Sequence, residues 1–226
     1  IVKSIEVLIN EHNKYNMLFM CNREDRKMKP ILFNTEMIKA ILEGKKTVTR
    51  RAIKLDLGLA DTDKNDSSYL KIPDEYGDHH DAKDLCKYQV GDILYVRETY
   101  CPNYFDEFVS NKLRCAYKAD WNPKLIDGAV PEPKWKPSIH MPKELARIFL
   151  KITDVRVERV QDITEMQVIK EGFSSDFDME TDTFYPNGYF FVKTWDNIYK
   201  DKGYGWEKNP FVWVIEFERK LAEHNK

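Results

Sequence analysis

The sequence predicts an α+β fold, a small β-barrel with helices packed at its edges and long loop insertions. Two segments, residues 147–160 and 211–217, alternate apolar with other side chains, which is typical of strands that bury one face. Shorter segments repeat apolar residues at helical spacing, and long bent strands with edge helices fit a barrel. Three polar stretches are typical of surface insertions: residues 55–88, 120–137 and 174–188.

The composition indicates a globular protein of one sizeable core. The chain has 226 residues, 42% apolar and 33% charged, with a net charge of −2, so any contact with nucleic acid must be local. Its four cysteines form no CxxC pair, and no run approaches the ~18 apolar residues that a membrane span needs. We therefore expect a cytoplasmic protein without a structural metal or other cofactor.

Residues 1–27 differ from the rest, because the chain begins without Met and lacks a signal-peptide pattern. We expect this stretch to be an N-terminal extension, with Met28 as a candidate start. Residues 28–226 would then form a single domain with insertions.

The first predicted helix begins at Asn34 or Thr35, both candidate N-caps, and ends at Gly44. Its apolar face consists of Met37, Ile38, Ile41 and Leu42. Further strands are expected at residues 93–98 and 113–119, and a phase slip near Thr153 predicts a bulge in the 147–160 strand. Two more helices are expected at residues 162–171, with Asp162 as cap and Glu165 as the acid of its first turn, and at 190–199.

A basic turn follows Gly44. Its cationic residues are Lys45, Lys46, Arg50 and Arg51, interleaved with hydroxyl side chains. Such a cluster suits a phosphate or nucleotide-like anion, although a solvated basic hairpin gives the same pattern.

Three further residues are candidate ligand contacts. Arg97 and Glu98 end a predicted strand, where they would line a pocket rim, form a structural ion pair or be unrelated surface charges. His140 is a candidate nucleobase contact or acid/base group, and packing is the common alternative. His79, His80, Asp81 and Asp84 lie in a polar stretch and are more typical of solvated residues than of metal ligands.

Four motifs, in order, resemble the ASCH domain family. They are GKKTVTRR from Gly44, GDILYVRE from Gly91, VRVE leading to DIT from Val155, and VWVIEF from Val212. The resemblance covers about half of the chain and implies a PUA-like β-barrel, in the larger insertion-containing form found in phages and prophages.

Some small members of that family remove the acetyl group from N4-acetylcytidine with a Lys, a Thr and a Glu. The matching positions here are Lys46, Thr49 and Glu171. A desolvated lysine among cations can activate a threonine hydroxyl, and the C-terminal end of a helix favours a protonated Glu171, which suits a general acid. Residues three apart on a strand face opposite sides, so Lys46 must lie in the turn if it shares a pocket with Thr49.

The resemblance and the basic turn leave two functions open. One is an amidohydrolase acting on a modified nucleoside. The other is a non-catalytic module that binds RNA or a nucleotide through Lys45, Lys46, Arg50 and Arg51. A ribonuclease or a phage–host interaction protein is a weaker third possibility.

Overall fold

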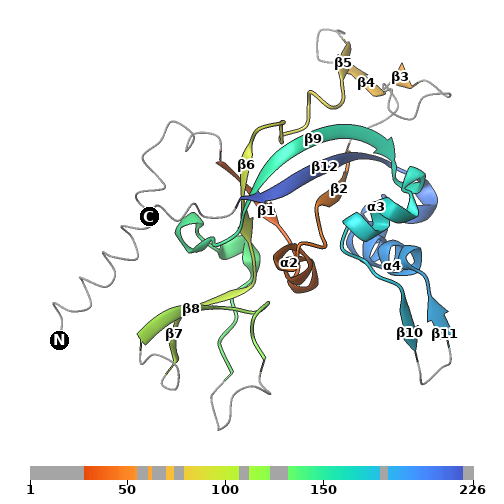
Figure 1. Ribbon diagram of the computed structural model, residues 1–226. Helices are drawn as coiled ribbons and strands as arrows, with labels where there is room; N and C mark the ends of the chain where they lie inside the picture. Colours follow the sequence, from red (N-terminus) through yellow and green to blue (C-terminus); the bar gives the residue numbers. More distant parts are fainter. Residues whose placement is uncertain are drawn as a thin grey trace. The chain divides into compact units, whose positions relative to one another are not determined.

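The computed structural model describes residues 28–54, 61–62, 70–73, 79–106, 112–122, 132–178 and 183–220 (Figure 1). The predicted N-terminal extension, residues 1–27, lies outside this part. The described residues divide into two compact units, which we take one at a time: unit 1 contains those in residues 28–38 and 92–150, and unit 2 those in residues 39–91 and 151–220. Helices and a larger share of strands occur together, so the α+β prediction is confirmed, and the small closed barrel stays a prediction.

Unit 1 is built on two strand pairs. Strand β1 (Met28–Leu32) lies parallel to β6 (Ile93–Arg97), and β7 (Tyr100–Asp106) lies antiparallel to β8 (Lys112–Tyr117). The register of β7 shifts between Cys101 and Tyr104, where Asn103 takes a positive φ of 58°. Strands β6 and β8 agree with the prediction. A small core of Tyr100, Met141 and Ala146 packs beside two 3₁₀ turns, η4 (Ser138–His140) and η5 (Lys143–Leu145).

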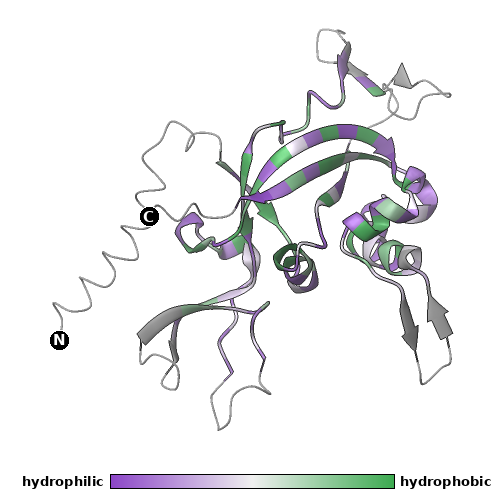
Figure 2. Cartoon of the chain, viewed as in Figure 1, coloured by the Kyte–Doolittle hydropathy of each residue, from purple (hydrophilic) through white to green (hydrophobic). Residues whose placement is uncertain are grey.

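Unit 2 holds three strands side by side, in the order β9 (Phe149–Arg159), β12 (Phe211–Lys220) and β2 (Val48–Ala52). The first two residues of β9 belong to unit 1. Strands β12 and β2 are antiparallel, with Val214 opposite Arg50 and Ile215 opposite Thr49. Hydrophobic and hydrophilic residues alternate along β9 and β12 (Figure 2), which confirms the strands predicted from that alternation.

Helix α2 (Thr35–Leu42) spans the boundary between the units. Its N-cap is Asn34, whose side-chain oxygen accepts a hydrogen bond from the Met37 backbone at 2.8 Å. The chain leaves the helix at Gly44, which has φ 73°, a conformation that costs glycine little. Both the helix and its end agree with the prediction.

Helix α3 (Glu165–Lys170) begins later than predicted. Its cap is Thr164, which forms a capping box with Gln167, because residues 160–162 are already used in the 3₁₀ turn η6 (Val160–Asp162). The prediction of Asp162 as the cap was therefore wrong.

Helix α4 (Asn187–Tyr199) and α3 cover the core of unit 2. This core consists of Val48, Ala52, Val160, Val168, Phe191, Trp195, Tyr199, Val212 and Val214. Two 3₁₀ turns, η7 (Lys200–Lys202) and η8 (Trp206–Lys208), follow α4 and lead into β12. Three aromatic residues of α4, Phe191, Trp195 and Tyr199, are thus core residues, while Tyr189 is exposed.

The stretches predicted as insertions contain short strands. Residues 55–88 include β3 (Asp61–Thr62), β4 (Leu70–Pro73) and β5 (His79–Asp81), an antiparallel sheet in that order, and residues 174–188 include the antiparallel pair β10 (Asp176–Asp178) and β11 (Thr183–Tyr185). Leu70 and Ala82 are buried against Ile53, Val157 and Phe211, so the first stretch is tied to unit 2 by apolar packing. Residues 120–137 are described in part, and Lys136 forms a β-bridge with Tyr100. No helix in the described ranges is long and apolar enough to cross a membrane.

Candidate functional site

Lys46 and Glu171 are in contact inside unit 2, although 125 residues separate them along the chain. The Lys46 ammonium donates to a Glu171 carboxylate oxygen at 2.6 Å and to the Glu171 backbone carbonyl at 2.8 Å. The backbones meet as well, since the two residues form an antiparallel bridge and the Thr47 amide donates to the Lys170 carbonyl. Local structure therefore fixes the pair, with Lys46 between α2 and β2 and Glu171 at the C-cap of α3.

Both side chains of this pair are buried, with 0% of the Lys46 side chain exposed and 4% of the Glu171 side chain. Burial lowers the pKa of Lys46, because the ammonium form loses hydration, and the neighbouring Glu171 carboxylate only partly opposes this effect. The charges of Arg50 and Arg51 lower it further. A lysine in these surroundings loses its proton more readily than an exposed one, which is the property that a general base needs.

Arg50 joins this pair to a second carboxylate. Its Nη1 donates to the other Glu171 oxygen at 3.2 Å, and its Nη2 donates to Glu158 on β9 at 3.0 Å. Only 1% of the Arg50 side chain is exposed. The third nitrogen, Nε, is buried and has no hydrogen-bond partner among the described residues. We call Lys46, Glu171, Arg50 and Glu158 the inner network.

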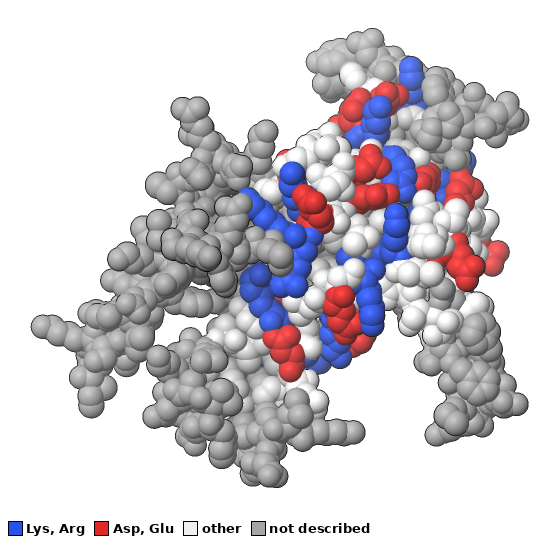
Figure 3. All heavy atoms as spheres, in the orientation of Figure 1, with Lys and Arg blue, Asp and Glu red and all other residues white. Residues whose placement is uncertain are grey.

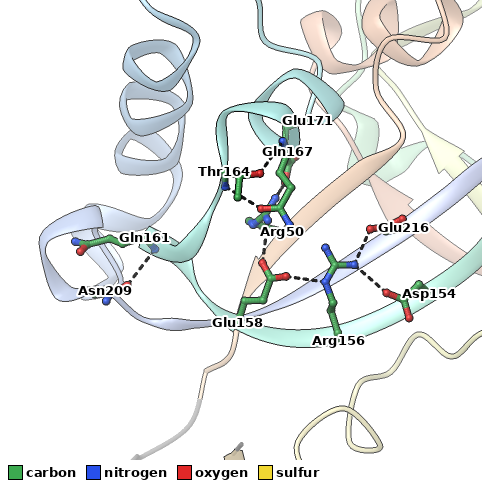
Figure 4. A network of polar contacts seen from close by, with 10 residues as sticks. All are labelled: Arg50, Asp154, Arg156, Glu158, Gln161, Thr164, Gln167, Glu171, Asn209 and Glu216. Atoms are coloured by element: carbon green, nitrogen blue, oxygen red, sulfur yellow. Dashed lines mark hydrogen bonds and ion pairs between the residues drawn. The ribbon is translucent and has the colours of Figure 1, made fainter. Parts of the chain in front are cut away.

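The inner network continues to the surface through Arg156. This residue donates to Glu158, Asp154 and Glu216, each at 2.6 to 2.8 Å (Figure 4). Exposure rises along the way, from 1% for the Arg50 side chain to 16% for Glu158 and 30% for Arg156. The buried end is therefore the part of the network in which electrostatic interactions are least screened by solvent.

Gly172 lets the two backbones approach at Lys46. A Cβ atom on Gly172 would lie 2.8 Å from Ala40 Cβ and 3.1 Å from Lys46 Cβ, and its φ of 91° is strained for any other residue. The glycine after Glu171 is thus required by the packing that brings Lys46 to α3.

Thr49, the third residue of the predicted catalytic set, is buried with 1% exposed. It follows Lys46 by three positions and lies next to Arg50 on β2, so the alternation of the strand directs its side chain away from the face of Arg50. No hydrogen bond joins its hydroxyl to Lys46 or Glu171 in the described part of the chain. The structure brings together Lys46 and Glu171, and it leaves Thr49 outside their hydrogen bonds.

The remaining residues of the basic turn behave differently from one another. Lys45 is exposed and pairs with Glu43 at 2.6 Å, and Arg51 is half-buried opposite Trp213. Acidic side chains lie beside basic ones over the visible face (Figure 3). The expected concentration of positive charge is therefore largely neutralised, because Lys46 and Arg50 have carboxylate partners and Lys45 has its own.

The three ligand candidates of unit 1 each have a protein partner. Arg97 Nε donates to the Met141 carbonyl at 2.7 Å, and the His140 carbonyl accepts from the Tyr100 hydroxyl while the His140 side chain is exposed. Arg97 and Glu98 do not pair with each other, since Glu98 is buried and accepts two hydrogen bonds from Arg147. These contacts give the side chains of Arg97 and Glu98 a structural role, and the part predicted for all three residues in ligand binding stays a prediction.

Sequence reasoning missed four charged residues that the structure makes central. They are Glu158 and Arg156 on β9, and Arg147 with Asp120 in unit 1. Arg156 and Glu158 are two apart on a predicted strand, so a shared face was available as a signal. Their partners come from distant segments, which no local pattern reveals.

Comparisons with protein-family models, with curated proteins and with solved structures give no match for this chain. The described residues also contain no group of three or more potential metal ligands. The contacts, burial and charges of the inner network are therefore the observations that bear on its chemistry.

Proposed function

We propose that the protein is an amidohydrolase of the ASCH type, with a PUA-like fold, that removes an acyl group from a modified nucleoside such as N4-acetylcytidine. The observation that carries the proposal is the wholly buried Lys46 amine held against the Glu171 carboxylate. Burial of an amine without catalytic use is costly, and desolvated lysines with a lowered pKa are common as bases and nucleophiles.

The charge balance of the inner network favours a neutral substrate over a polyanion. With Lys46 protonated, Lys46 and Arg50 carry two positive charges against the two negative charges of Glu171 and Glu158, and with Lys46 neutral the four residues have a net negative charge. A phosphate clamp needs an excess of positive charge, which these four residues do not supply. This weakens the use of Lys46 and Arg50 as phosphate contacts and supports chemistry on an uncharged group.

In the proposed reaction the neutral Lys46 amine takes a proton from a water molecule as the water oxygen attacks the acyl carbon. The carbonyl oxygen of the substrate then carries the negative charge of a tetrahedral intermediate. When this intermediate collapses, the bond from the acyl carbon to the exocyclic nitrogen breaks, and Lys46 returns the proton to that nitrogen. Acetic acid and cytidine leave, so every atom and proton is accounted for.

Glu171 acts in this scheme by orienting Lys46. The general-acid role expected from its place at the end of a helix is replaced here, because both of its oxygens accept hydrogen bonds from cationic groups. Thr49 remains the alternative nucleophile. Water is the better choice, since Thr49 forms no hydrogen bond to Lys46 in the described residues. Thr49→Val, which removes the hydroxyl, would abolish activity only if that hydroxyl attacks the acyl carbon.

The test is to incubate the protein with N4-acetylcytidine and follow the release of acetate and cytidine. Turnover that Lys46→Met abolishes supports the hydrolase. Absence of turnover together with RNA binding that weakens steeply with salt, and that Arg51→Ala reduces, would support the non-catalytic RNA-binding module instead.

A further inference from the structure

Arg50 has one buried donor without a hydrogen-bond partner among the described residues. Its guanidinium is buried, two of its nitrogens are paired with Glu171 and Glu158, and Nε has no partner among the described residues. An arginine side chain offers five N–H groups in a rigid plane, so the direction of the Nε–H bond is fixed once the other two nitrogens are held. Buried polar hydrogens are almost always paired, and one left over in a native structure needs an explanation.

The position of Arg50 relates this donor to the proposed chemistry. Lys46 and Arg50 bind the two oxygens of the same Glu171 carboxylate, so the amine and the guanidinium are held side by side. A substrate group that reacts at Lys46 is therefore within reach of Arg50. The Nε–H bond is preorganised, which is the requirement for a donor that stabilises developing negative charge.

The charges around Arg50 select the kind of acceptor. Its positive charge already faces two carboxylates, and Glu158 is itself paired with Arg156. A phosphate or carboxylate ligand would add a further anion to a group in which each cation already has a carboxylate partner. A carbonyl oxygen adds no charge in the ground state and gains charge only as the reaction proceeds.

We propose that the Arg50 Nε–H donates a hydrogen bond to the acyl carbonyl oxygen of the substrate, so that Arg50 recognises a neutral acyl group and stabilises the oxyanion formed from it. This inference rests on the proposed amidohydrolase function. It makes Arg50 a catalytic residue, and it defines the ligand as a compound with an uncharged carbonyl next to the scissile nitrogen.

The experiment compares N4-acetylcytidine with its N4-thioacetyl analogue, whose sulfur is a poor hydrogen-bond acceptor. The quantity measured is the ratio of kcat/KM for the oxygen compound to that for the sulfur compound. Arg50→Lys keeps a positive charge between Glu171 and Glu158 and removes Nε. We expect it to lower kcat for N4-acetylcytidine by about 10²-fold or more, as the loss of one oxyanion donor does, and to reduce the ratio strongly.

Arg156→Lys is the matched control, because it makes the same change in an arginine that pairs with the same Glu158. The ratio should stay at the wild-type value in this variant. A purely structural role for Arg50 would slow both substrates equally and leave the ratio unchanged, and that result overturns the proposal while the hydrolase assignment stands. Wild-type protein that turns over neither compound overturns both.

A second measurement covers the case in which Arg50→Lys does not fold. The Arg50 Nε–H resonance of the wild-type protein is followed by NMR at a pH where turnover is slow. It should shift on addition of N4-acetylcytidine and not of N4-ethylcytidine, which has a methylene group in place of the carbonyl. Equal shifts with both ligands, or competition by millimolar inorganic phosphate, contradict the proposal.

Discussion

The two units each contain a buried carboxylate bound by an arginine. They differ in how many nitrogens of that arginine have a hydrogen-bond partner. In unit 1 the Arg147 network consists of Glu98, Arg147 and Asp120. All three nitrogens of Arg147 donate, Nε and Nη2 to Glu98, and Nη1 and Nη2 to Asp120, and the guanidinium also lies 4.0 Å from the centre of the Tyr117 ring. In unit 2 the inner network contains a wholly buried amine, and one guanidinium nitrogen has no partner in the part of the chain that the structure describes.

From this difference we infer that the Arg147 network stabilises the fold and that the inner network has a function. A network in which every guanidinium nitrogen has a hydrogen-bond partner holds a structure together and leaves no nitrogen for a ligand. Burial raises the pKa of Glu98, and the hydrogen bonds and charge of Arg147 partly oppose that effect. Burying the Lys46 amine and a guanidinium nitrogen without a described partner costs free energy of folding. Groups with such a cost concentrate at functional sites.

The largest expected effect is on the catalysis that we propose for the inner network. Lys46→Met keeps the length of the side chain and removes the base, so kcat for N4-acetylcytidine should fall by roughly 10³-fold, within the usual range for general-base loss. The measurement is the initial rate of acetate release. Lys45→Met is the control, because Lys45 is exposed and pairs only with Glu43, and its rate should equal the wild-type rate. Equal losses in both variants would contradict the assignment.

Removing Arg147 should act on stability. Arg147→Met leaves the Glu98 carboxylate buried without its partner, which should lower the free energy of unfolding by about 3 kcal/mol, the lower end for a broken buried pair because Arg147 is 26% exposed. Urea denaturation gives the value, and Arg219→Met, at an exposed arginine, is the control. A raised KM for N4-acetylcytidine in stable Arg147→Met protein would instead support ligand binding by Glu98.

Gly172 tests the backbone approach that forms the Lys46–Glu171 contact. Gly172→Ala would place Cβ against Ala40 and Lys46, and Gly203→Ala has a similar positive φ with open space around it. The positive φ should destabilise both variants by about 1 kcal/mol. The contacts of the new Cβ with Ala40 and Lys46 should destabilise Gly172→Ala by about 1 to 2 kcal/mol more. Thermal unfolding gives both values. Equal changes would show that Gly172 is needed for its φ alone.

The smallest effect is expected at the exposed end of the network. Glu216→Gln removes one of three carboxylates around Arg156, and the side chains of both residues are about 30% exposed. The free energy of unfolding should change by less than about 0.5 kcal/mol, and kcat should be unchanged. A large loss of activity would mean that the exposed charges around Arg156 take part in the reaction, which would contradict the assignment of catalysis to the inner network.

The longer helices and strands were predictable from the sequence, because the spacing of the apolar residues on their buried face differs between a helix and a strand. The alternation in residues 147–160 and 211–217 gave β9 and β12, and helical spacing gave α2 and α4. Strand β7 was missed, because Pro102 and Asn103 interrupt its pattern and the structure accommodates them with a register shift. The start of α3 was misplaced for a related reason, since Asp162 and Thr164 both suit a cap and only tertiary structure decides between them.

The candidate site was predictable only in part. Lys46, Thr49 and Glu171 came from the resemblance to a family, and the structure adds the contact between Lys46 and Glu171. Arg50 was expected to bind phosphate on the strength of its charge. Its pairing with Glu171 and Glu158 depends on segments more than 100 residues away, so its partners could not be inferred from neighbours in the sequence.

The pH dependence of wild-type kcat/KM for N4-acetylcytidine tests the central claim most directly. The reactive form of Lys46 is the neutral amine, and burial lowers the pKa of Lys46. The rate should therefore rise with pH, about tenfold per unit at first, and level off below the range in which an ordinary lysine titrates. Turnover that does not change with pH, or no turnover at any pH, would contradict the role of Lys46 as the base.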